Sequence, residues 1–494
     1  MKIDPRIFRE YDVRGVAGTY FDPKVVAEYE KWYGKFTGIS IDLPVAEAIG
    51  KAYGSYVKRQ GGKKVVVGFE KRPFAEELTG AFIKGVVSTG IEVSYLGIAL
   101  TSIVYFATAY YDFDGGVNIT GSHNVYFFNG FKMMLKGVAP LYGQELLKLK
   151  EMVEEEDFES GQGKVVEKEV WEDYLGYIAE HVFKEGKLKV VVDCGNGSAG
   201  LFAPKLLREL NCEVVELFTQ PDATFPNHVP DPEMPQNMKW LMDKVKEEKA
   251  DLGMAFDADG DRVGFVDEKG EMVNADILLL ALSRDVLSRN RGKKILFDVK
   301  CTELLNKLVP TWGGVPLMHA TGHAPIKATL RKDSEVILGG EISGHFYFVE
   351  NYFRIDDGLF GAARVLEMYR RSGKEKFSDL FSEFPKLIIT PEIKLPCVDE
   401  KKFAVVVAVV KAVKDKYRSV TIDGIRFYLD DDTWALVRAS NTSPYLTIRA
   451  EGKTEEAVIK IKNILAGILD GFPEIGDKLN RTQVASLTGR LGWL

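Results

Sequence analysis

The stretch of the sequence with the clearest potential for chemistry is DADGDR at residues 257–262, which places three aspartates within five positions. Three like charges this close repel one another, so we expect a cation among them. Carboxylate oxygens at alternate positions are hard ligands that suit Mg²⁺ or Mn²⁺. The stretch therefore predicts a divalent-metal loop whose ligands are Asp257, Asp259 and Asp261.

Two other interpretations compete with the metal loop. An EF-hand would use the same aspartates with Glu268, but its sixth position requires Gly and is Arg262, and strands rather than helices are expected on both sides. A solvated acidic turn is common for Asp-Gly sequences. Three alternating aspartates after a buried apolar strand favour the metal over both.

A second cluster, TGSHN at residues 120–124, offers Ser122 as a nucleophile. The alternative is an ordinary turn, because Gly, Ser and Asn are turn formers. A serine hydrolase would need the frame GxSxG, whereas Ser122 is followed by His123 and Asn124. The chain continues to NGFK, which brings Lys132 onto the adjoining expected strand.

Two further polar loops could bind a ligand. GEISGH (340–345) has acidic, hydroxyl and imidazole groups at alternate positions, which on an extended loop lie on one face and suit sugar hydroxyls. RASNTSP (438–444) combines the groups of a phosphate cradle. A polar loop closing a strand and an ST-turn before Pro444 are the alternatives. The candidate residues of these two loops are Glu341, Ser343, His345, Arg438, Ser440, Asn441 and Thr442. Two weaker loops, DVKCTE (298–303) and TGHAPIK (321–327), add Lys300, His323 and Lys327.

The elements that must position these loops recur three times. GKKVVVG (62–68), GKLKVVVD (186–193) and GKKILFD (292–298) each follow a Gly-Lys turn with an aliphatic run, as buried parallel strands do. A second strand follows each repeat 40 to 65 residues later and ends in one of the polar clusters. Helix, strand and polar loop in alternation predict α/β domains, in which ligands bind beyond the carboxyl ends of strands.

The last hundred residues follow another pattern. Two expected paired strands, FYLDDDTWALVRAS and PYLTIRAE, precede an amphipathic final helix with Val458, Ile461, Leu465 and Ile468 on one stripe. The fold class is therefore α/β, with three similar α/β domains and a C-terminal α+β domain. We expect the domains to span residues 1–168, 169–271, 272–385 and 386–494.

Composition and charge argue against several classes of protein. The 494 residues carry a net charge of −7 with a pI near 5.7, which disfavours nucleic acid and anionic membranes as partners. No apolar run approaches the ~20 residues of a membrane span, and MKIDPRIFRE has no secretory h-region. The four cysteines lack CxxC spacing, as expected of free thiols in a reducing cytoplasm. We expect a cytoplasmic protein that binds small molecules.

Taken in order, the polar clusters resemble one family, the α-D-phosphohexomutases, which include phosphomannomutase and phosphoglucomutase. The likeness covers most of the chain. The motifs that carry it are FREYDVRG (8–15), TGSHN with NGFK, DCGNGSAG (193–200), TFPNHVPDP (224–232), DADGDR, DVKCTE, TGH, GEISGH and RASNTSP.

The resemblance implies four domains around a central active-site cleft and a phosphorylated serine at Ser122. One Mg²⁺ per chain would be held by the three aspartates of DADGDR and by a phosphate oxygen on Ser122. Phospho-Ser122 would donate to a hexose phosphate, giving a hexose 1,6-bisphosphate intermediate that also serves as activator. Its other phosphate would then return to Ser122.

The resemblance also assigns roles to the remaining residues. Arg14, Lys132, Arg262 and Lys300 would supply positive charge at the transferring group, and His345 and Lys132 would move protons. Glu341 and Ser343 would hold the sugar hydroxyls O3 and O4, while RASNTSP would hold the phosphate that is not reacting. Tyr11 and His323 would line the cleft.

The sequence departs from the family pattern at several places. Val125 stands where the family usually has Pro, and GFEKRPFAEE replaces a GRDxR-type loop but keeps Arg72. Residues 18–44 are expected to be an insertion that packs locally, covers a surface or forms a subunit contact, and the tail beyond Gly471 is extra.

Several alternatives for the function stay open. GEISGH is nearer the GEMSGH of bifunctional phosphomannomutase/phosphoglucomutases, whereas phosphoglucosamine mutases usually have Gln at the position of Ile342. A metal-dependent sugar phosphatase and a non-catalytic sugar-phosphate sensor are the other candidates. The sequence leaves monomer and homodimer equally open.

Overall fold

The structure is a computed structural model, and it describes residues 1, 3–8, 10–18, 23–33, 35–398, 400–440, 445–472 and 475. Of residues 28 and 31–33 it describes the backbone alone. The chain divides into two compact units. Unit 1 comprises Met1–Ile295, Trp312–Gly314 and Gly322–Ser382; unit 2 comprises Leu296–Thr311, Val315–Thr321 and the chain from Glu383 onward.

The first sheet of unit 1 has the strand order β1-β5-β4-β2-β3-β7, with β6 paired to β5. Its strands are β1 (Val13–Val16), β2 (Lys64–Phe69), β3 (Glu92–Ile98), β4 (Gly115–Ile119), β5 (Phe128–Leu135), β6 (Ala139–Pro140) and β7 (Val165–Glu167). Strands β2, β3 and β4 are parallel, and β5 returns antiparallel to β4. The loops that follow β2, β3 and β4 therefore meet at one edge, as the sequence predicts.

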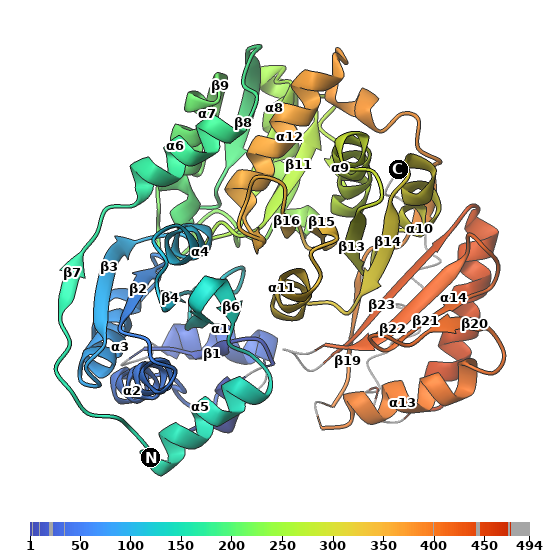
Figure 1. Cartoon of the computed structure of the whole chain (residues 1–494). Coiled ribbons are helices and arrows are strands. Elements are labelled where there is room, and N and C mark those ends of the chain that lie inside the picture. Colours follow the sequence, from blue (N-terminus) through green and yellow to red (C-terminus); the bar gives the residue numbers. More distant parts are fainter. Residues whose placement is uncertain are drawn as a thin grey trace. The chain divides into compact units, whose positions relative to one another are not determined.

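Helices cover both faces of this sheet (Figure 1). Tyr53 of α2 and Thr108 of α4 contact the adjacent glycines Gly115 and Gly116, which point to opposite faces of β4. On α2, Ile49 and Tyr53 are fully buried and Tyr56, one turn further along, is half-buried. The helices of this part of the chain, not all of which pack on the sheet, are α1 (Pro23–Tyr33), α2 (Leu43–Arg59), α3 (Ala75–Val87), α4 (Thr101–Tyr110), α5 (Gln144–Glu155) and α6 (Trp171–His181).

The second sheet of unit 1 has the order β12-β11-β10-β8-β9. Strands β8 and β10 are parallel, and β10 and β11 form a hairpin whose turn is DADGDR. Helix α8 is amphipathic and buries Met238, Leu241 and Val245 on one face. The elements are β8 (Leu188–Asp193), β9 (Cys212–Leu217), β10 (Leu252–Phe256), β11 (Val263–Asp267), β12 (Met272–Val273), α7 (Ala203–Glu209), α8 (Pro235–Glu248) and α9 (Ala275–Arg289).

The rest of unit 1 contains an antiparallel meander of β15, β16 and β17, with GEISGH as the turn between the first two strands. Strand β13 (Lys294–Asp298) begins in unit 1 and ends in unit 2. The other elements here are β15 (Val336–Gly340), β16 (Phe346–Phe348), β17 (Ile355–Asp356), α11 (His323–Lys332) and α12 (Gly358–Ser372).

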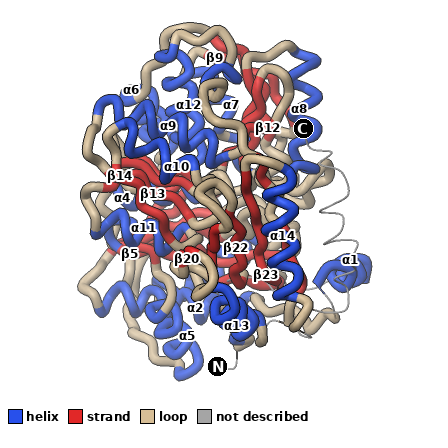
Figure 2. The backbone as a smooth tube through the Cα atoms, turned by 90° about the vertical axis from the view of Figure 1, so that its right-hand side faces the viewer, coloured by secondary structure: helices blue, strands red, loops and turns tan. Residues whose placement is uncertain are grey.

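Unit 2 is built on an antiparallel sheet of order β18-β23-β22-β21-β20, with β19 paired to β23. Helices α13 and α14 pack on one face through Val409, Ile461 and Leu465 (Figure 2). The predicted final helix is correct, and so is the pairing of WALVRA with YLTIRAE, whereas the start of the first predicted strand belongs to β21 and the turn before β22. The elements are α10 (Leu304–Leu308), β14 (Val315–His319), β18 (Ile388–Ile389), β19 (Ile393–Pro396), α13 (Lys402–Val413), β20 (Arg418–Val420), β21 (Ile425–Tyr428), β22 (Trp434–Ala439), β23 (Tyr445–Gly452) and α14 (Glu455–Leu469).

The cysteines behave as the sequence predicts. Cys194, Cys212, Cys301 and Cys397 are all buried and free. Among the described residues, no helix combines the length and the apolar composition that crossing a bilayer requires.

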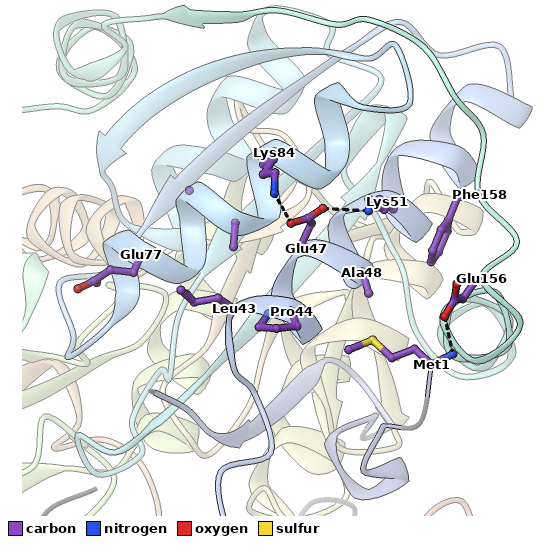
Figure 3. Close-up of a pocket in the computed structure, with 12 residues that line it drawn as sticks. Met1, Leu43, Pro44, Glu47, Ala48, Lys51, Glu77, Lys84, Glu156 and Phe158 are labelled. Carbon is purple, nitrogen blue, oxygen red and sulfur yellow. Dashed lines mark hydrogen bonds and ion pairs between the residues drawn. The ribbon is translucent and has the colours of Figure 1, made fainter. Parts of the chain in front are cut away.

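A surface groove of about 660 Å³ lies on unit 1, and Figure 3 shows its lining. Glu47 sits between Lys51 and Lys84 on its wall, and the Met1 ammonium pairs with Glu156 at its rim. None of the residues predicted to do chemistry lines this groove. The candidate site therefore has to be sought where the polar loops meet.

Helix α12 begins at a buried carboxyl group. Asp357 accepts hydrogen bonds from the Phe360 amide at 2.9 Å and from the hydroxyls of Tyr174 and Tyr352. Burial raises the pKa of Asp357 from 3.8 to about 7, although these donors oppose the shift. The hydrogen bonds of Asp357 thus connect α12 to α6, while its burial disfavours the ionised form of the carboxyl group.

This raised pKa predicts that the Asp357 contribution to stability is lost as the pH rises from 3.8 to about 7. The folded protein holds the proton more tightly than the unfolded chain, so stability is greatest below 3.8. The unfolding free energy of the wild type minus that of Asp357→Asn should fall by up to about 4 kcal/mol over this range. Denaturant titrations at a series of pH values measure it, with Asp42→Asn, a half-buried cap of α2, as control. A difference that is flat or rises with pH contradicts the prediction.

Candidate active site

Ser122 lies at the tip of the loop between β4 and β5, in a backbone conformation with φ +51° that is uncommon for serine. Its side chain is nearly buried, and its Oγ lies 3.3 Å from both Asp257 Oδ2 and His123 Nδ1. The Ser122 amide donates to Thr120 Oγ1 at 2.7 Å. The loop thus presents the hydroxyl directly to the aspartate cluster of the β10–β11 hairpin.

The shape of this loop is set by a fully buried ion pair, Glu70–Arg72, with 2.6 Å between Oε1 and Nε. The Arg72 guanidinium donates to the main-chain carbonyls of Asn124 and Val125, each at 2.9 Å. It also donates to the carbonyls of Ser122 and Phe128. The second oxygen of Glu70 accepts from the Gly121 amide at 3.1 Å and from the Thr120 hydroxyl.

Gly121 is required by this arrangement, because a Cβ there would lie 2.4 Å from the Arg72 guanidinium. Arg14 of β1 also reaches the loop, donating to the Gly121 carbonyl and pairing with Asp12. Two guanidinium groups therefore fix the loop through its backbone. Although GFEKR departs from the family's GRDxR-type sequence, its residues Glu70 and Arg72 contact the Ser122 loop.

The three aspartates are fully buried in the hairpin turn, and one oxygen from each lies within 4.8 Å of the others. Asp259 Oδ1 and Asp261 Oδ1 have no hydrogen-bond partner among the described residues. Burial, followed by the charges of Asp259 and Asp261, raises the pKa of Asp257 well above its ordinary value. Buried oxygens without donors and a surplus of negative charge are the surroundings that a divalent cation needs. The residues present therefore fit the predicted metal.

Lys132 of β5 compensates part of the negative charge of the three aspartates. Its Nζ lies 2.8 Å from Asp259 Oδ2 and also pairs with Asp261. Burial alone would lower the pKa of Lys132, but the two carboxylates outweigh it and raise the pKa. Lys132 lies on β5, the strand that follows the Ser122 loop, as the sequence predicts.

Asp259 is also held by the N-terminus of α4. Thr101 Oγ1 donates to Asp259 Oδ2 at 2.6 Å, and the Thr101 amide donates to the Asp259 carbonyl at 2.9 Å. Asn118 of β4 donates to Thr101 Oγ1 at 2.8 Å. Because Asn118 occupies the acceptor side of the hydroxyl, the Thr101 proton is directed toward Asp259. Burial opposes ionisation of Asp259, but Lys132 and Thr101 outweigh it and lower the pKa.

The prediction that GEISGH is an extended loop is wrong. Residues 341–345 form a tight turn, in which the Glu341 amide donates to the His345 carbonyl and the Gly344 amide donates to the Glu341 carbonyl. Gly344 adopts φ +89°, a conformation that closes the hairpin and that residues other than glycine rarely adopt. The turn, and not an alternating pattern along a strand, therefore brings the side chains of Glu341, Ser343 and His345 together.

This turn is bonded to the metal loop, since the Val263 amide donates to the Gly344 carbonyl at 3.1 Å. The Glu341 carboxylate accepts from the Gly322 amide at 2.8 Å and from the Tyr347 hydroxyl at 2.6 Å. Ser343 and Glu341 are both buried. The turn is therefore rigid at the residue predicted to recognise the sugar.

Imidazole rings lie beside this turn. His345 Nε2 accepts from Arg262 Nε at 3.0 Å, and the His323 and His345 rings stack with centroids 5.9 Å apart. Tyr11 meets His323 edge-on at 6.0 Å. Burial, followed by the Lys327 charge, lowers the pKa of His323 well below its ordinary value. Tyr11, Lys132 and His323 also line one narrow cavity of about 10 Å³.

Unit 2 carries the remaining candidates. Lys300 Nζ lies 2.9 Å from Glu392 Oε2, and that ammonium lowers the pKa of Glu392 to about 2 although burial opposes the shift. Arg438 Nε donates to Asp423 Oδ2 at 2.8 Å, and Ser440 is buried. Asn441 and Thr442 lie outside the described residues.

Comparison with known proteins decides the family. Models of the phosphoglucomutase/phosphomannomutase alpha/beta/alpha domains I, II and III match residues 29–160, 172–270 and 274–387, and the model of the C-terminal domain matches residues 392–468. The chain is 40% identical to a phosphomannomutase/phosphoglucomutase of Pseudomonas aeruginosa over 93% of its length and 94% of that protein. The chain belongs to the phosphoglucomutase/phosphomannomutase family.

Two more relatives agree. A phosphoglucomutase of Neisseria meningitidis is 35% identical over 95% of this chain and 98% of that protein. A crystal structure of a phosphoglucomutase/phosphomannomutase family protein from Burkholderia thailandensis superposes with a TM-score of 0.85 at 37% identity, covering 95% and 98% of the two chains. The predicted phosphohexomutase class and the fold of three α/β domains and a C-terminal domain are confirmed. The exact domain boundaries remain predictions.

Sequence reasoning missed several residues that this phosphohexomutase uses to hold its site. Thr101, Asn118 and Glu70 position the metal loop and the Ser122 loop, and Asp356 lies against His345. Thr101 follows the end of a strand and opens a helix, where hydroxyl side chains are frequent for local reasons. Only its hydrogen bond to Asp259, far along the chain, distinguishes Thr101 from an ordinary residue at the start of a helix.

The insertion packs locally in its described part. Tyr29 of α1 contacts Phe36, Phe127 and Phe128, with ring centroids 5.4 to 6.4 Å apart. Phe127 and Phe128 directly follow the Ser122 loop. The extra tail from 476 onward lies outside the described residues.

Arg72→Lys should lower kcat at least about 10-fold, because a single ammonium cannot bond four carbonyls in the planar pattern of a guanidinium and Ser122 would shift. Steady-state assays of sugar-phosphate isomerisation measure the effect. Lys71→Arg, the reverse exchange on the exposed neighbour, is the control. Unchanged kcat in Arg72→Lys would show that the loop keeps its shape without this scaffold.

Thr101→Val should weaken binding of Mg²⁺ or Mn²⁺ about 10-fold or more, because Asp259 loses the donor that orients it. Calorimetric titration of the metal into purified protein measures the affinity directly. Thr108→Val removes a buried hydroxyl of the same helix that bonds only Val104 and Met134. Equal affinities in the two variants would contradict a role for Thr101 at the metal loop.

Proposed function

We propose that the protein interconverts the 1-phosphates and 6-phosphates of mannose and glucose through phospho-Ser122 and a hexose 1,6-bisphosphate intermediate. The observation that carries the proposal is the placement of Ser122 Oγ 3.3 Å from Asp257, at a cluster of buried carboxylates with unpaired oxygens. A sugar-phosphate sensor would need neither the hydroxyl nor the cluster. One relative named phosphomannomutase/phosphoglucomutase and another named phosphoglucomutase support the choice of sugars.

The metal would be Mg²⁺, one per chain, held by Asp257, Asp259, Asp261 and a phosphate oxygen on Ser122. When bound, it would neutralise the transferring phosphoryl group and polarise its bond to Ser122. Arg14, Lys132 and Arg262 would add positive charge around the same group. Phosphoryl transfer depends mainly on such positioning and charge neutralisation.

Transfer breaks the bond between phosphorus and Ser122 Oγ and forms a bond between phosphorus and a sugar oxygen. The proton of that sugar hydroxyl passes to His345, and Ser122 Oγ regains a proton from Lys132. The bisphosphate then turns over, and its other phosphate returns to Ser122 by the same steps in reverse order. The bisphosphate also phosphorylates any Ser122 that has lost its phosphate, which makes it the activator.

The turn with Glu341 and Ser343 would hold the sugar hydroxyls O3 and O4. These two positions roughly interchange when the sugar flips, so one rigid turn can serve both orientations. Tyr11 and His323 would line the cleft. Arg438, Ser440, Asn441 and Thr442 remain predicted to bind the phosphate that is not reacting, so that remote binding energy aligns the reacting end. Lys300 remains predicted to add positive charge at the transferring group.

A glucosamine phosphate is the second candidate substrate. A relative from Methanothermobacter thermautotrophicus named probable phosphoglucosamine mutase is 31% identical over 94% of this chain and 98% of that protein. Ile342, at the position where such enzymes usually have Gln, favours mannose and glucose. We also propose that the enzyme acts in the cytoplasm, as a monomer or homodimer, on free sugar phosphates and without nucleic acid or membrane as partner.

The proposal is tested by ³¹P NMR of the protein with glucose 1-phosphate or mannose 1-phosphate, Mg²⁺ and a trace of the 1,6-bisphosphate. Growth of the 6-phosphate signal is expected with both sugars. Ser122→Ala should lose at least about 1,000-fold in turnover while still binding the sugar phosphate, because only the acceptor of the phosphoryl group is removed.

Growth of inorganic phosphate instead of the 6-phosphate would replace the mutase with a phosphatase. Isomerisation of glucosamine 1-phosphate alone would move the substrate to amino sugars. A protein that binds all three sugars and changes none of them would be a sensor.

A further inference from the structure

His345 is held from both of its ring nitrogens. On one side Nε2 lies 3.0 Å from Arg262 Nε, and on the other Nδ1 lies 3.1 Å from Asp356 Oδ2. The contact with Asp356 is not linear, yet neither Nδ1 nor Oδ2 has a hydrogen bond to any other described residue. The two buried polar atoms thus face each other as the available partners.

The donors determine which nitrogen carries the proton. Arg262 Nε can only donate, so His345 Nε2 has to be the acceptor in that pair. A neutral imidazole with an accepting Nε2 carries its hydrogen on Nδ1, and a carboxylate is the group that accepts it there. Asp356 therefore selects the tautomer whose Nε2 lone pair is free to take a proton.

Asp356 is fully buried on β17, and its other oxygen is fixed by Lys327 of α11 at 2.7 Å. The same Lys327 ammonium donates to the Tyr105 hydroxyl at 2.8 Å and lies 4.0 Å from the centre of that ring. Burial opposes ionisation of Asp356, but Lys327 and then His345 outweigh it and lower the pKa. The carboxylate stays charged and its Oδ2 is left for His345.

The other groups around His345 cannot take over this task. Asp261 Oδ1 is farther from Nδ1, at 3.8 Å, and is one of the three carboxylates of the metal loop, although it also lies close enough to His345 and Asp356 to form a metal-binding group with them. The rings of His323 and Tyr347 stack on His345, with centroids 5.9 and 6.3 Å away, and offer no acceptor in its plane. Arg262 approaches only Nε2.

We propose that Asp356 is a positioning residue that fixes His345 in the Nδ1–H tautomer, so that Nε2 can exchange a proton with the sugar hydroxyl during phosphoryl transfer. The inference rests on the proposed mutase function. A sugar hydroxyl takes the place of Arg262 at Nε2 and gives up its proton as the phosphorus–oxygen bond forms; the return of the second phosphate reverses the step. A carboxylate, a histidine and a hydroxyl in this order form the arrangement by which enzymes orient a general base.

The test has to separate this role from simple neutralisation of Lys327. Asp356→Asn keeps the size of the side chain and removes its charge, which leaves the Lys327 ammonium buried without a counter-ion. Asp356→Asn combined with Lys327→Met removes both charges. Thermal unfolding, kcat and KM are measured for the wild type, each single variant and the double variant, with Mg²⁺ and saturating bisphosphate.

Asp356→Asn should lower kcat about 100-fold or more with KM changed less than about threefold, because proton transfer is impaired and sugar contacts are not. The double variant should recover thermal stability but not kcat. Recovery of kcat in the double variant would overturn the inference, because Asp356 would then act only as the counter-ion of Lys327. So would an Asp356→Asn enzyme with wild-type kcat.

A spectroscopic reading is independent of turnover. The chain has 6 histidines, so ¹⁵N-histidine labelling gives few imidazole signals, and His345→Gln identifies the signal of His345. The wild type should show Nδ1 protonated, and Asp356→Asn should show a mixture of tautomers or the opposite one. The wild-type pattern in Asp356→Asn would contradict the inference. A wild type without mutase activity would instead remove the proposed function and leave the tautomer result standing.

Discussion

The site depends on one constraint, the concentration of negative charge in a buried hairpin turn. Three carboxylates in the β10–β11 turn have to be compensated within a few ångströms, because an isolated charge in the interior costs several kcal/mol. Lys132 and the Thr101 hydroxyl provide part of this from β5 and α4, and Arg262 lies at the end of the turn. Two carboxylate oxygens of the turn, Asp259 Oδ1 and Asp261 Oδ1, still have no hydrogen-bond partner among the described residues, which fits a divalent cation at this place.

The Glu70–Arg72 pair serves position rather than stability. Burial raises the pKa of Glu70 and lowers that of Arg72, against the attraction between the two groups. A fully buried pair of this kind adds little net stability, since the loss of hydration offsets the Coulomb energy. In return, the planar guanidinium holds four carbonyls of the loop that presents Ser122. An arrangement of this kind contributes to catalysis by fixing the position of a reacting group.

Much of the fold could be predicted from the sequence, because the repeated aliphatic strands and amphipathic helices have clear periods. The stripe on α8 and the paired strands β22 and β23 follow directly from Met238, Leu241 and Val245 and from TWALVRA and YLTIRAE. The candidate metal loop could be predicted because three aspartates in one turn repel one another unless a cation lies between them, and the structure brings their oxygens together. Asp356 could not be predicted as a partner of His345, because it precedes a helix and resembles an ordinary cap.

The error at GEISGH has a related cause. Alternating polar residues fit an extended strand, and only the positive φ of Gly344 converts them into a turn. The partners of Glu341 are the Gly322 amide and the Tyr347 hydroxyl, which come from the start of α11 and from β16. Such pairings depend on how distant elements pack, and periodicity along the chain carries no information about them.

The scaffolding of the Ser122 loop through its carbonyls affects how the sequence of this loop can vary. Every residue has a carbonyl, so Arg72 holds the loop in one shape whichever side chains Asn124, Val125 and Phe128 carry. Val125 can thus occupy the usual place of a proline, and Phe127 and Phe128 can pack against Tyr29 of the insertion. The conformation of the loop is encoded some fifty residues upstream, at the end of β2. Substitutions within the loop can bring new neighbours while Ser122 keeps its place.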